Sequence, residues 1–355
     1  MNLFENHSPS EREGARERIT VMGIDLAKNV FELCGRDASG GIVLKRQIRR
    51  KQLREFVAKL SPGLIGMEAC PGSHYWAREF RNMGHEVRWM SPQFVKPYVK
   101  SNKSDTAAAE AISEAVTRPT MRFVGIKTVE QQDLLGLHRI RERLIRNRTA
   151  LMNQIRGLVG EYGIVVAVGE PSLRRELPRF LEDAECGLTP KGREWMAQLY
   201  EELKEVAERI EQYEKQIGME FSSSEICQRL SKVPGVGPIT STAIVATVGD
   251  AHVFRKGREL SAWLGLVPRQ HSTGGKPRLL GISKRGDKYV RKLLVHGARA
   301  VLQRVGEKSD RQSQWLRKLQ ATRGTNKACV ALANKNARIL WALMASGQEY
   351  RTSAA

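Results

Sequence analysis

Apolar and polar residues alternate with two different periods over residues 19–124. Short apolar runs predict β-strands over residues 19–26, 30–37, 42–48, 64–70 and 85–91. Apolar residues three or four apart predict helices over 51–60 and 73–84, and an alanine-rich stretch predicts another over 104–117. Three strands in succession, followed by strands that alternate with helices, indicate an α/β layer.

Two long amphipathic helices are predicted next, over residues 130–162 and 193–221. Each carries an apolar stripe, and Leu203, Ile210 and Ile217 of the second helix are spaced seven residues apart. Stripes of this kind pack against each other, which predicts an antiparallel coiled-coil hairpin. Such a hairpin would serve as an arm or a dimer surface, and a plain helical spacer is the alternative.

A Gly- and Pro-rich stretch separates the two long helices, and the pattern changes again at Ser223. There a helical segment, a Gly/Pro turn and a loop-rich stretch lead to Asp287, and a helix is predicted over 289–305. The chain is therefore predicted to contain a polar tail over 1–18, an α/β domain over 19–124, a helical hairpin over 125–222, an α-rich domain over 223–305 and a basic helical extension over 306–355.

The chain is strongly basic, because 59 Lys and Arg residues stand against 38 Asp and Glu residues and give a formal net charge of +21. An excess of this size attracts polyanions, of which nucleic acid is the commonest large one. No apolar stretch approaches the roughly 18 residues of a membrane-spanning helix, and the first residues contain no apolar core of a secretion signal. We therefore expect a cytoplasmic protein with no membrane partner.

The five cysteines are scattered along the chain, and no two of them form a CxxC pair. This spacing argues against a disulfide framework and against a zinc ribbon. With 41% apolar residues the chain can bury hydrophobic cores without such cross-links. Free, buried thiols in a reducing compartment are the expected outcome.

Three acidic residues stand where predicted strands end or a predicted helix begins. Asp25 ends the first strand in GIDLAK, Glu68 ends a later strand in GMEAC, and Asp105 opens a helix in NKSDTAAAEA. Carboxylates that converge in this way suit Mg²⁺, which takes few protein carboxylates and leaves positions for phosphate oxygens. Taken singly, each acid is more simply a solvated turn or capping residue, and Asp105 would suit a helix N-cap. The order of the three along the chain favours the metal site.

Longer motifs surround these acids, namely GIDLAKNVFELC, GMEACPGSHYWAREF and VKPYVKSNKSDTAAAEAISEAVTRPTMRFV. Through them the chain resembles the insertion-sequence-110 family of transposases, and its 1111 subgroup in particular, from Ile19 to Val305. The resemblance implies a RuvC-like domain of the RNase H type with a DEDD carboxylate set, a coiled-coil segment and a C-terminal transposase domain. It also implies Mg²⁺ or Mn²⁺ as cofactor, and site-specific DNA strand cleavage and exchange as activity.

The carboxylate set of that family has four members, and Asp25, Glu68 and Asp105 match three of them. The fourth acid is expected one helical turn after Asp105, on the same helix face, but Ala108 stands there. Glu110 lies two residues further on, on a different face, and is not expected to substitute. The replacement leaves open a form of the protein that binds nucleic acid without cutting it.

The segment SAWLGLVPRQHSTGGKPRLLGISKRGDKYVRKLL resembles the family's transposase domain, in which a serine is the nucleophile, and Ser272 matches that position. Without the resemblance, this Ser-Thr-Gly-Gly run is an ordinary turn. His271 is a candidate base by proximity alone. Glycines here would let a DNA backbone approach and cations would hold phosphates, the residues being Gly274, Gly275, Lys276, Arg278, Lys284 and Arg285.

Further candidates for nucleic-acid binding lie outside these motifs. The run VPGVGP, with Gly235 and Gly237, looks like a helix-hairpin-helix turn whose backbone N–H groups hold a phosphate, and a plain helix break is the alternative. Lys103, just before the third acid, is another candidate. Five arginines crowd into ten residues of the first long helix as a basic collar, with a solvated face as the alternative, and they are Arg139, Arg141, Arg143, Arg146 and Arg148.

The resemblance implies target DNA, donor DNA and a noncoding bridge RNA as partners. Because the acids and Ser272 lie in different predicted domains, we expect a composite site between protomers of a dimer or tetramer. A DNA invertase or a junction-resolving nuclease of the RuvC type would use the carboxylates without Ser272. A purely structural, basic coiled-coil protein is disfavoured, because ordered motifs occur in two domains.

Overall fold

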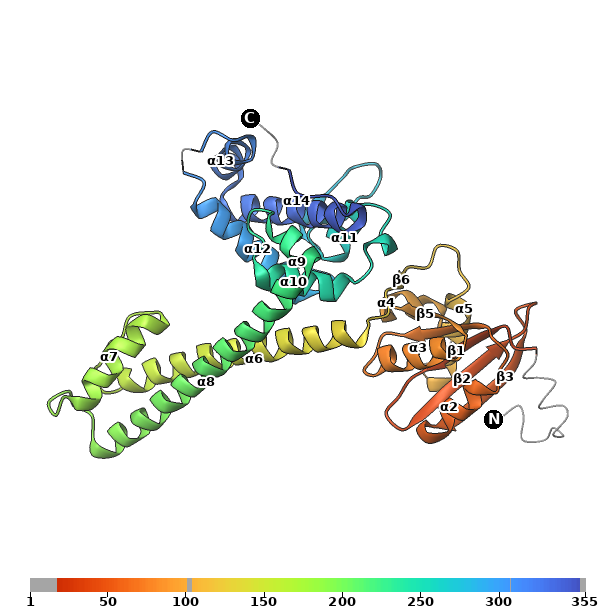
Figure 1. The fold of residues 1–355 in the computed structure, drawn as a ribbon, viewed down its shortest axis with the longest axis horizontal. Coiled ribbons are helices and arrows are strands. Elements are labelled where there is room, and N and C mark those ends of the chain that lie inside the picture. The colour runs from red at the N-terminus through yellow and green to blue at the C-terminus, as the bar shows by residue number, and fades with distance from the viewer. Residues whose placement is uncertain (1–17, 101–103, 307, 352–355) are drawn as a thin grey trace. The chain divides into compact units, whose positions relative to one another are not determined.

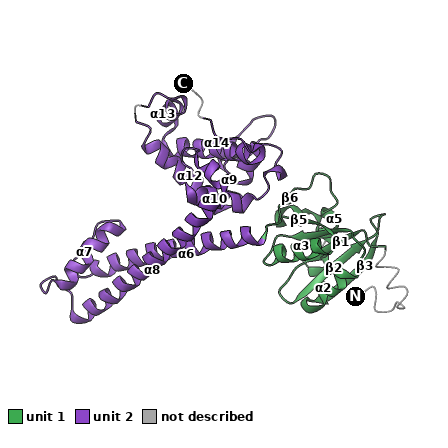
Figure 2. Ribbon diagram, in the orientation of Figure 1, with its two compact units in different colours: residues 1–128 green, residues 129–355 purple. Residues whose placement is uncertain are grey.

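The computed structural model describes residues 18–100, 104–306 and 308–351, and it divides into two compact units. Unit 1 comprises residues 1–128 and unit 2 residues 129–355 (Figure 2). The predicted N-terminal tail, apart from Arg18, and also Lys103 lie outside the described residues. Each unit has hydrophobic cores of its own.

Unit 1 is built on a six-stranded sheet with the order β3-β2-β1-β4-β5-β6 (Figure 1). Its strands are β1 Val21–Asp25, β2 Val30–Arg36, β3 Ile42–Arg49, β4 Leu64–Glu68, β5 Glu86–Met90 and β6 Phe123–Val124. β1, β2 and β3 form an antiparallel meander, β4 and β5 run parallel to β1, and β6 is antiparallel to β5. The five predicted strands are confirmed, whereas the two-residue β6 is too short to show any alternation.

Helices cover both faces of this sheet, because its strands alternate apolar residues between two cores. The helices are α2 Arg50–Ala58, α3 Ser73–Asn82, α4 Pro92–Val95, the 3₁₀ helix η1 Lys96–Tyr98 and α5 Asp105–Ala115. Met22 and Ile24 of β1 belong to the core that α2 and α3 cover. Val21 of the same strand packs on the opposite face, which α5 covers. The mixed α/β architecture expected of a RuvC-like domain is therefore present.

α5 packs closely across the sheet at two glycines. A Cβ added to Gly23 of β1 would lie 2.5 Å from the backbone nitrogen of Ser113, and one added to Gly66 of β4 would lie 2.8 Å from the Cβ of Val116. Side chains do not fit at such distances, so glycine is what lets the helix approach the strands.

The direction of α5 decides what lies at the carboxyl ends of the strands. Val21 and Leu64, which begin β1 and β4, pack against the cluster that contains Ala115 and Val116 at the end of the helix. α5 therefore runs antiparallel to both strands. Its first turn, which begins at Asp105, lies toward the end of the sheet where β1 and β4 terminate.

Unit 2 begins with three helices, α6 Val129–Gly160, α7 Glu170–Glu182 and α8 Pro190–Ser223. α6 and α8 pack along each other (Figure 1). Leu173 and Leu177 of α7 belong to the core that these two helices share. Both long helices were expected from their apolar stripes. α7 lies in the Gly- and Pro-rich stretch, where Pro178 interrupts the helical pattern.

The rest of unit 2 is helical around one core. Its elements are α9 Glu225–Ser231, α10 Pro238–Val248, the 3₁₀ helix η2 Ala251–Val253, α11 Gly257–Trp263, β7 Pro268–Gln270, β8 Leu279–Ile282, α12 Lys288–Gln303, α13 Arg311–Arg323 and α14 Thr325–Ser346. Cys329 and Leu332 of α14 share the core with Leu294 of α12, so the segment after Gly306 is an integral part of this body. Within residues 18–100, 104–306 and 308–351, no helix combines the length and the apolarity needed to cross a bilayer.

A buried histidine ties α6 to the C-terminal helices. The Nδ1 of His138 lies 3.0 Å from the Tyr289 hydroxyl of α12, and its Nε2 lies 3.1 Å from the Thr242 Oγ1 of α10. Burial and, second, the positive charge of Arg141 lower the pKa of His138 to about 4. The ring is therefore neutral at pH 7, and it joins three helices of unit 2 by hydrogen bonds.

Candidate active site

Asp25 and Glu68 end two neighbouring parallel strands on the sheet face that α5 covers. β1 and β4 pair with Ile24 opposite Met67, so the two acids follow at adjacent positions. Each acid comes two residues after the glycine against which α5 packs, and alternate strand residues share a face. Burial and, second, the negative charges of Asp25 and Glu68 raise the pKa of the Cys70 thiol to about 11. The structure brings these two predicted acids together.

Asp105 is the first residue of α5, and its side chain is exposed. The N-cap is Ser104, whose Oγ accepts a hydrogen bond from the Ala107 nitrogen at 3.2 Å, so the capping role considered for Asp105 belongs to its neighbour. Ala108 follows one turn later and is half-buried. Across the described part of the chain, no three acidic, His or Cys side chains are arranged to hold a metal ion. The structure thus pairs two of the predicted acids and leaves the third apart.

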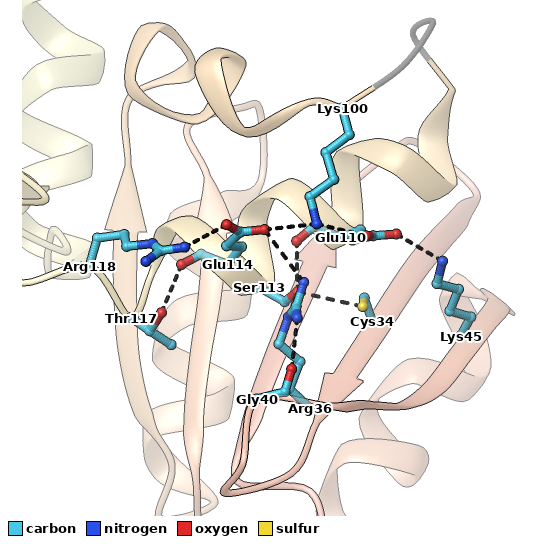
Figure 3. A network of polar contacts seen from close by, with 10 residues as sticks. All are labelled: Cys34, Arg36, Gly40, Lys45, Lys100, Glu110, Ser113, Glu114, Thr117 and Arg118. Atoms are coloured by element: carbon cyan, nitrogen blue, oxygen red, sulfur yellow. Dashed lines mark hydrogen bonds and ion pairs between the residues drawn. The ribbon is translucent and has the colours of Figure 1, made fainter.

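Glu110 is held on α5 by ion pairs, which Figure 3 shows. Its carboxylate lies 2.8 Å from the Lys45 Nζ of β3 and 3.6 Å from the Lys100 Nζ. The hydrogen bond from Lys45 lowers the pKa of Glu110. One turn later, Glu114 pairs with Lys100 at 3.3 Å and with Arg118 at 2.5 Å. Glu110 is therefore engaged as an ion-pair partner of β3.

Ser272 lies in the exposed hairpin that β7 and β8 form. Its Oγ accepts a hydrogen bond from the Gln270 Nε2 at 2.8 Å and another from the Arg278 backbone nitrogen at 3.3 Å. Both bonds leave the serine proton available for transfer, because the oxygen acts as acceptor in each. The backbone N–H of His271 donates to the Arg278 carbonyl at 3.0 Å, and no described contact joins the His271 ring to Ser272.

The two glycines after Ser272 serve the turn of this hairpin. Gly274 and Gly275 have φ values of 56° and 75°, and they connect the bridged residues Thr273 and Lys276. Two successive positive φ values make a two-residue turn that glycine adopts without strain. Because nothing lies within 4 Å of a Cβ added at either glycine, the turn also leaves its outer side open to a ligand.

All four predicted cations of this region are exposed. Lys276 and Arg278 flank the turn and are exposed, and Arg285 is exposed as well. Lys284 is the one non-glycine residue with a positive φ, 55°, among the described residues. Its backbone nitrogen donates to the Gly265 carbonyl at 3.1 Å, which fixes the base of the hairpin to the turn that follows α11.

The five arginines of α6 fall into two groups. Arg141 donates from Nε to Glu214 of α8 at 2.9 Å, and Arg148 pairs with Glu170 of α7 at 2.7 Å. The three that are exposed are spaced by one helical turn, and they are Arg139, Arg143 and Arg146. The predicted collar is therefore a stripe of three exposed cations on one face of α6. The other two arginines, Arg141 and Arg148, connect α6 to α8 and to α7.

The Gly/Pro turn at 233–238 connects α9 to α10, as expected for a helix-hairpin-helix. Gly235 has a φ of 85°, and a Cβ there would lie 2.7 Å from the Gly297 carbonyl of α12, so this glycine permits a close helix contact. Gly237 is exposed at the start of α10, with open space where a Cβ would be. Asn336 of α14 donates to the Pro234 carbonyl at 2.9 Å and anchors the turn.

Comparison with known proteins places both regions in one family. A family model described as "Transposase", of the DEDD IS110 type, matches residues 22–164, and the model "Transposase IS116/IS110/IS902 family" matches residues 227–314. The chain is 49% identical over 344 residues to "Transposase for insertion sequence element IS1111A" of Coxiella burnetii, which covers 97% of this chain and 94% of that protein. It is 49% identical over 334 residues to "Probable family 20 transposase" of Pseudomonas aeruginosa, covering 94% and 99%. The chain belongs to the IS116/IS110/IS902 family of transposases.

The transposase is therefore an enzyme that acts on DNA. A further relative, "Transposase for insertion sequence element IS1328" of Yersinia enterocolitica, is 40% identical over 329 residues and covers 93% of this chain and 98% of its own length. The first matched segment contains Asp25, Glu68 and Asp105, and the second contains Ser272. The recognition of an insertion-sequence transposase from its motifs is confirmed at the level of the family.

The carboxylate pair of the transposase fits a hard divalent cation. Mg²⁺ is commonly bound by one or two carboxylates, with waters and substrate phosphates in the other positions. Asp25 and Glu68 supply two such groups on adjacent strands. Carboxylate oxygens are hard ligands, which suit Mg²⁺ and Mn²⁺.

Gly23 and Gly66 are site residues that the sequence analysis missed. Both motifs, GID and GME, carry a glycine two residues before the acid. A glycine inside a strand often marks a close backbone approach, which is the signal that could have found them. By admitting α5 to the strands, these glycines set how near the first turn of the helix comes to Asp25 and Glu68.

Proposed function

We propose that this transposase cuts and rejoins DNA strands of an insertion element through a phosphoserine link at Ser272, with a divalent metal held by its carboxylates. The observation that carries the proposal is the pairing of Asp25 and Glu68 at the ends of β1 and β4, beneath the helix that begins at Asp105. The family membership of both the carboxylate segment and the serine segment supports it.

Each carboxylate has a distinct part in this proposal. Asp25 and Glu68 would hold Mg²⁺ or Mn²⁺, and Asp105 would reach the same ion from the start of α5 when DNA is bound. The metal would polarise the phosphate and stabilise charge on the leaving oxygen. The protein's own contribution is to orient the carboxylates, and the α5 contacts at Gly23 and Gly66 serve that end.

Ser272 supplies the nucleophile. Its oxygen bonds to the DNA phosphorus, the bond from phosphorus to the leaving sugar oxygen breaks, and the serine proton ends on that sugar oxygen as a hydroxyl. A sugar hydroxyl of the new partner strand then attacks the phosphoserine, the bond from phosphorus to the serine oxygen breaks, and the proton of the attacking hydroxyl passes to Ser272. The hydrogen bonds from Gln270 and Arg278 orient the oxygen for this attack. The acids and the serine would meet in an oligomer, in which different copies supply them to one phosphate.

Ala108 predicts a weak or absent cleavage activity for this chain, because one of the family's four acids is missing. The test is to compare the chain with the variants Ala108→Asp and Ala108→Asn, the second being a control of similar size without charge. Protein–DNA adducts are counted on denaturing gels with Mg²⁺ and with EDTA. Adduct that appears with Asp alone, and only with Mg²⁺, supports the proposal, and equal activity of all three proteins contradicts it.

A nucleic-acid-binding form that does not cut is the second candidate, and Ala108 is the observation that favours it. We further propose that a noncoding RNA guides this protein to its DNA sites. The net charge of +21 would help to bind that RNA. RNA recovered with the purified chain and sequenced would test this part. A single noncoding RNA from the ends of the element is the expected result, and a random mixture of cellular RNA contradicts guidance.

A further inference from the structure

A groove of about 1410 Å³ runs between the β7–β8 hairpin and the helices α13 and α14. Leu279 and Leu280 of β8 form one wall, and both side chains are exposed to solvent, Leu279 by 65%. The other wall contains Trp315 of α13, with Val330 and Ile339 of α14. Exposed apolar side chains that line a groove of this volume indicate a binding site.

The charge of the groove identifies the kind of ligand. Arg311, Lys327, Lys335 and Arg338 line it, and none of its described lining residues is acidic. No described carboxylate forms an ion pair with any of the four. The Lys335 Nζ lies 5.2 Å from the centre of the half-buried Trp315 ring, so a cation lies over an aromatic ring in the wall of the groove. Four cations without counter-charges attract a polyanion.

The combination of cations with exposed apolar side chains favours a single strand over a duplex. A duplex hides the faces of its bases, whereas an unpaired strand presents both phosphates and base faces. Proteins that hold single strands combine a positive groove with aromatic side chains on which bases stack.

The groove also adjoins the serine hairpin. The Ser272 Oγ accepts a hydrogen bond from the backbone nitrogen of Arg278, the residue that directly precedes the groove residue Leu279. A strand held with its phosphate at Ser272 could therefore continue along β8 into the groove.

We propose that this groove binds an unpaired stretch of the DNA strand that Ser272 attacks, with Trp315 stacking on a base and Lys327 and Arg338 holding phosphates. The inference rests on the proposed role of Ser272 for the identity of the strand. It goes beyond that role by assigning the strand's path to residues after Gly306.

The first experiment measures binding of fluorescein-labelled single-stranded DNA of about 16 nucleotides to the full chain in EDTA, where no cleavage occurs. The groove variant is Lys327→Glu with Arg338→Glu. The matched control is Lys318→Glu with Arg323→Glu, two exposed cations of α13 that do not line the groove and change the net charge equally. We expect the groove variant to weaken binding at least about tenfold and the control less than about threefold. Equal losses in both variants would overturn the proposal.

The second experiment separates stacking from charge. Because Trp315 also packs against the core, Trp315→Phe is measured beside Trp315→Leu, and folding is checked by circular dichroism. Leu is expected to weaken single-strand binding about fivefold to tenfold, Phe to retain most of it, and duplex binding to be unchanged in both. A loss that is equal for duplex and single strand contradicts the proposal, as does a groove-dependent preference for RNA of the same sequence.

The two proposals fail in different ways. If adducts form at Ser272 while the groove variants bind single strands normally, the groove assignment is wrong and the serine chemistry stands. If binding depends on the groove but no adduct forms at Ser272 in any variant, the serine chemistry is wrong, and the groove is a single-strand site that serves some other step.

Discussion

His138 makes the stability of unit 2 sensitive to mildly acidic pH. The ring is buried where α6, α10 and α12 meet, and it is hydrogen-bonded to Tyr289 and Thr242 in its neutral form. Burial and the charge of Arg141 lower its pKa to about 4, whereas an exposed histidine has a pKa of about 6.5. Between these two pH values the unfolded chain binds a proton that the folded chain does not, so stability falls as pH is lowered.

The size of this effect follows from the two pKa values. A difference of about 2.5 units corresponds to about 3 kcal/mol when the pH has fallen to 4. Most of this loss of stability occurs above pH 5, because lowering the pH from 7 to 5 is expected to reduce the free energy of unfolding by about 2 kcal/mol. The change at pH values above about 7 is small, because the histidine is then neutral in both states.

The assay compares the chain with His138→Gln, which keeps a donor and an acceptor but does not titrate. Unfolding of unit 2 is followed in the full chain across a urea series by mass-spectrometric measurement of how far Cys329, which is fully buried, has reacted with a dipyridyl disulfide, because the other free cysteines react with the same reagent. Other groups titrate equally in both proteins, so their contributions cancel in the comparison. The variant is expected to lose about 2 kcal/mol less than the parent between pH 7 and pH 5. Equal losses in the two proteins would show that His138 is not the source of this pH dependence.

Four other features of the structure give measurable predictions. Gly23→Ala places a Cβ against the backbone of α5 and is expected to lower the free energy of unfolding by about 1–3 kcal/mol and to weaken Mn²⁺ binding in a titration. Gly157→Ala, in open space on α6, is expected to raise stability by up to about 1 kcal/mol, and a loss there would contradict the packing argument. The Cys70 thiol, with its pKa of about 11, should react with iodoacetamide at pH 8 about two orders of magnitude more slowly than an ordinary thiol, and a normal rate would rule out its burial beside the acids. Arg143→Glu should weaken DNA binding without lowering stability, whereas Arg148→Ala should do the reverse, as thermal melts and binding curves would show.

The local pattern of apolar and polar residues was sufficient to predict most strands and helices of unit 1. In β1, alternate residues such as Met22 and Ile24 are apolar, and this alternation predicts both the strand and its buried face. α7 could not be predicted from local pattern, because it contains Pro178 and its helical state depends on packing against α6 and α8. The β7–β8 hairpin could not be predicted either, because apolar residues such as Leu279 are exposed at positions where alternation would require polar residues.

Site residues that lie at the ends of strands could be predicted from the sequence. Contacts of the site between residues far apart in the sequence could not. Asp25 and Glu68 follow from their places at the ends of apolar runs. The engagement of Glu110 with Lys45, 65 residues away, follows only from how α5 crosses the sheet. In the same way, nothing local distinguishes Arg141 from its exposed neighbours, since its partner in α8 is set by helix packing.

The proposed chemistry requires that Ser272 form a covalent bond to DNA under the direction of the carboxylates. To test this, the Ala108→Asp protein is incubated with element-end DNA and Mg²⁺ and digested, and any phosphorylated residue is located by mass spectrometry. We expect a nucleotide linked to Ser272 that is lost with Ser272→Ala and with Asp25→Asn. Strand cleavage that persists in Ser272→Ala, with no nucleotide on any serine, would contradict it.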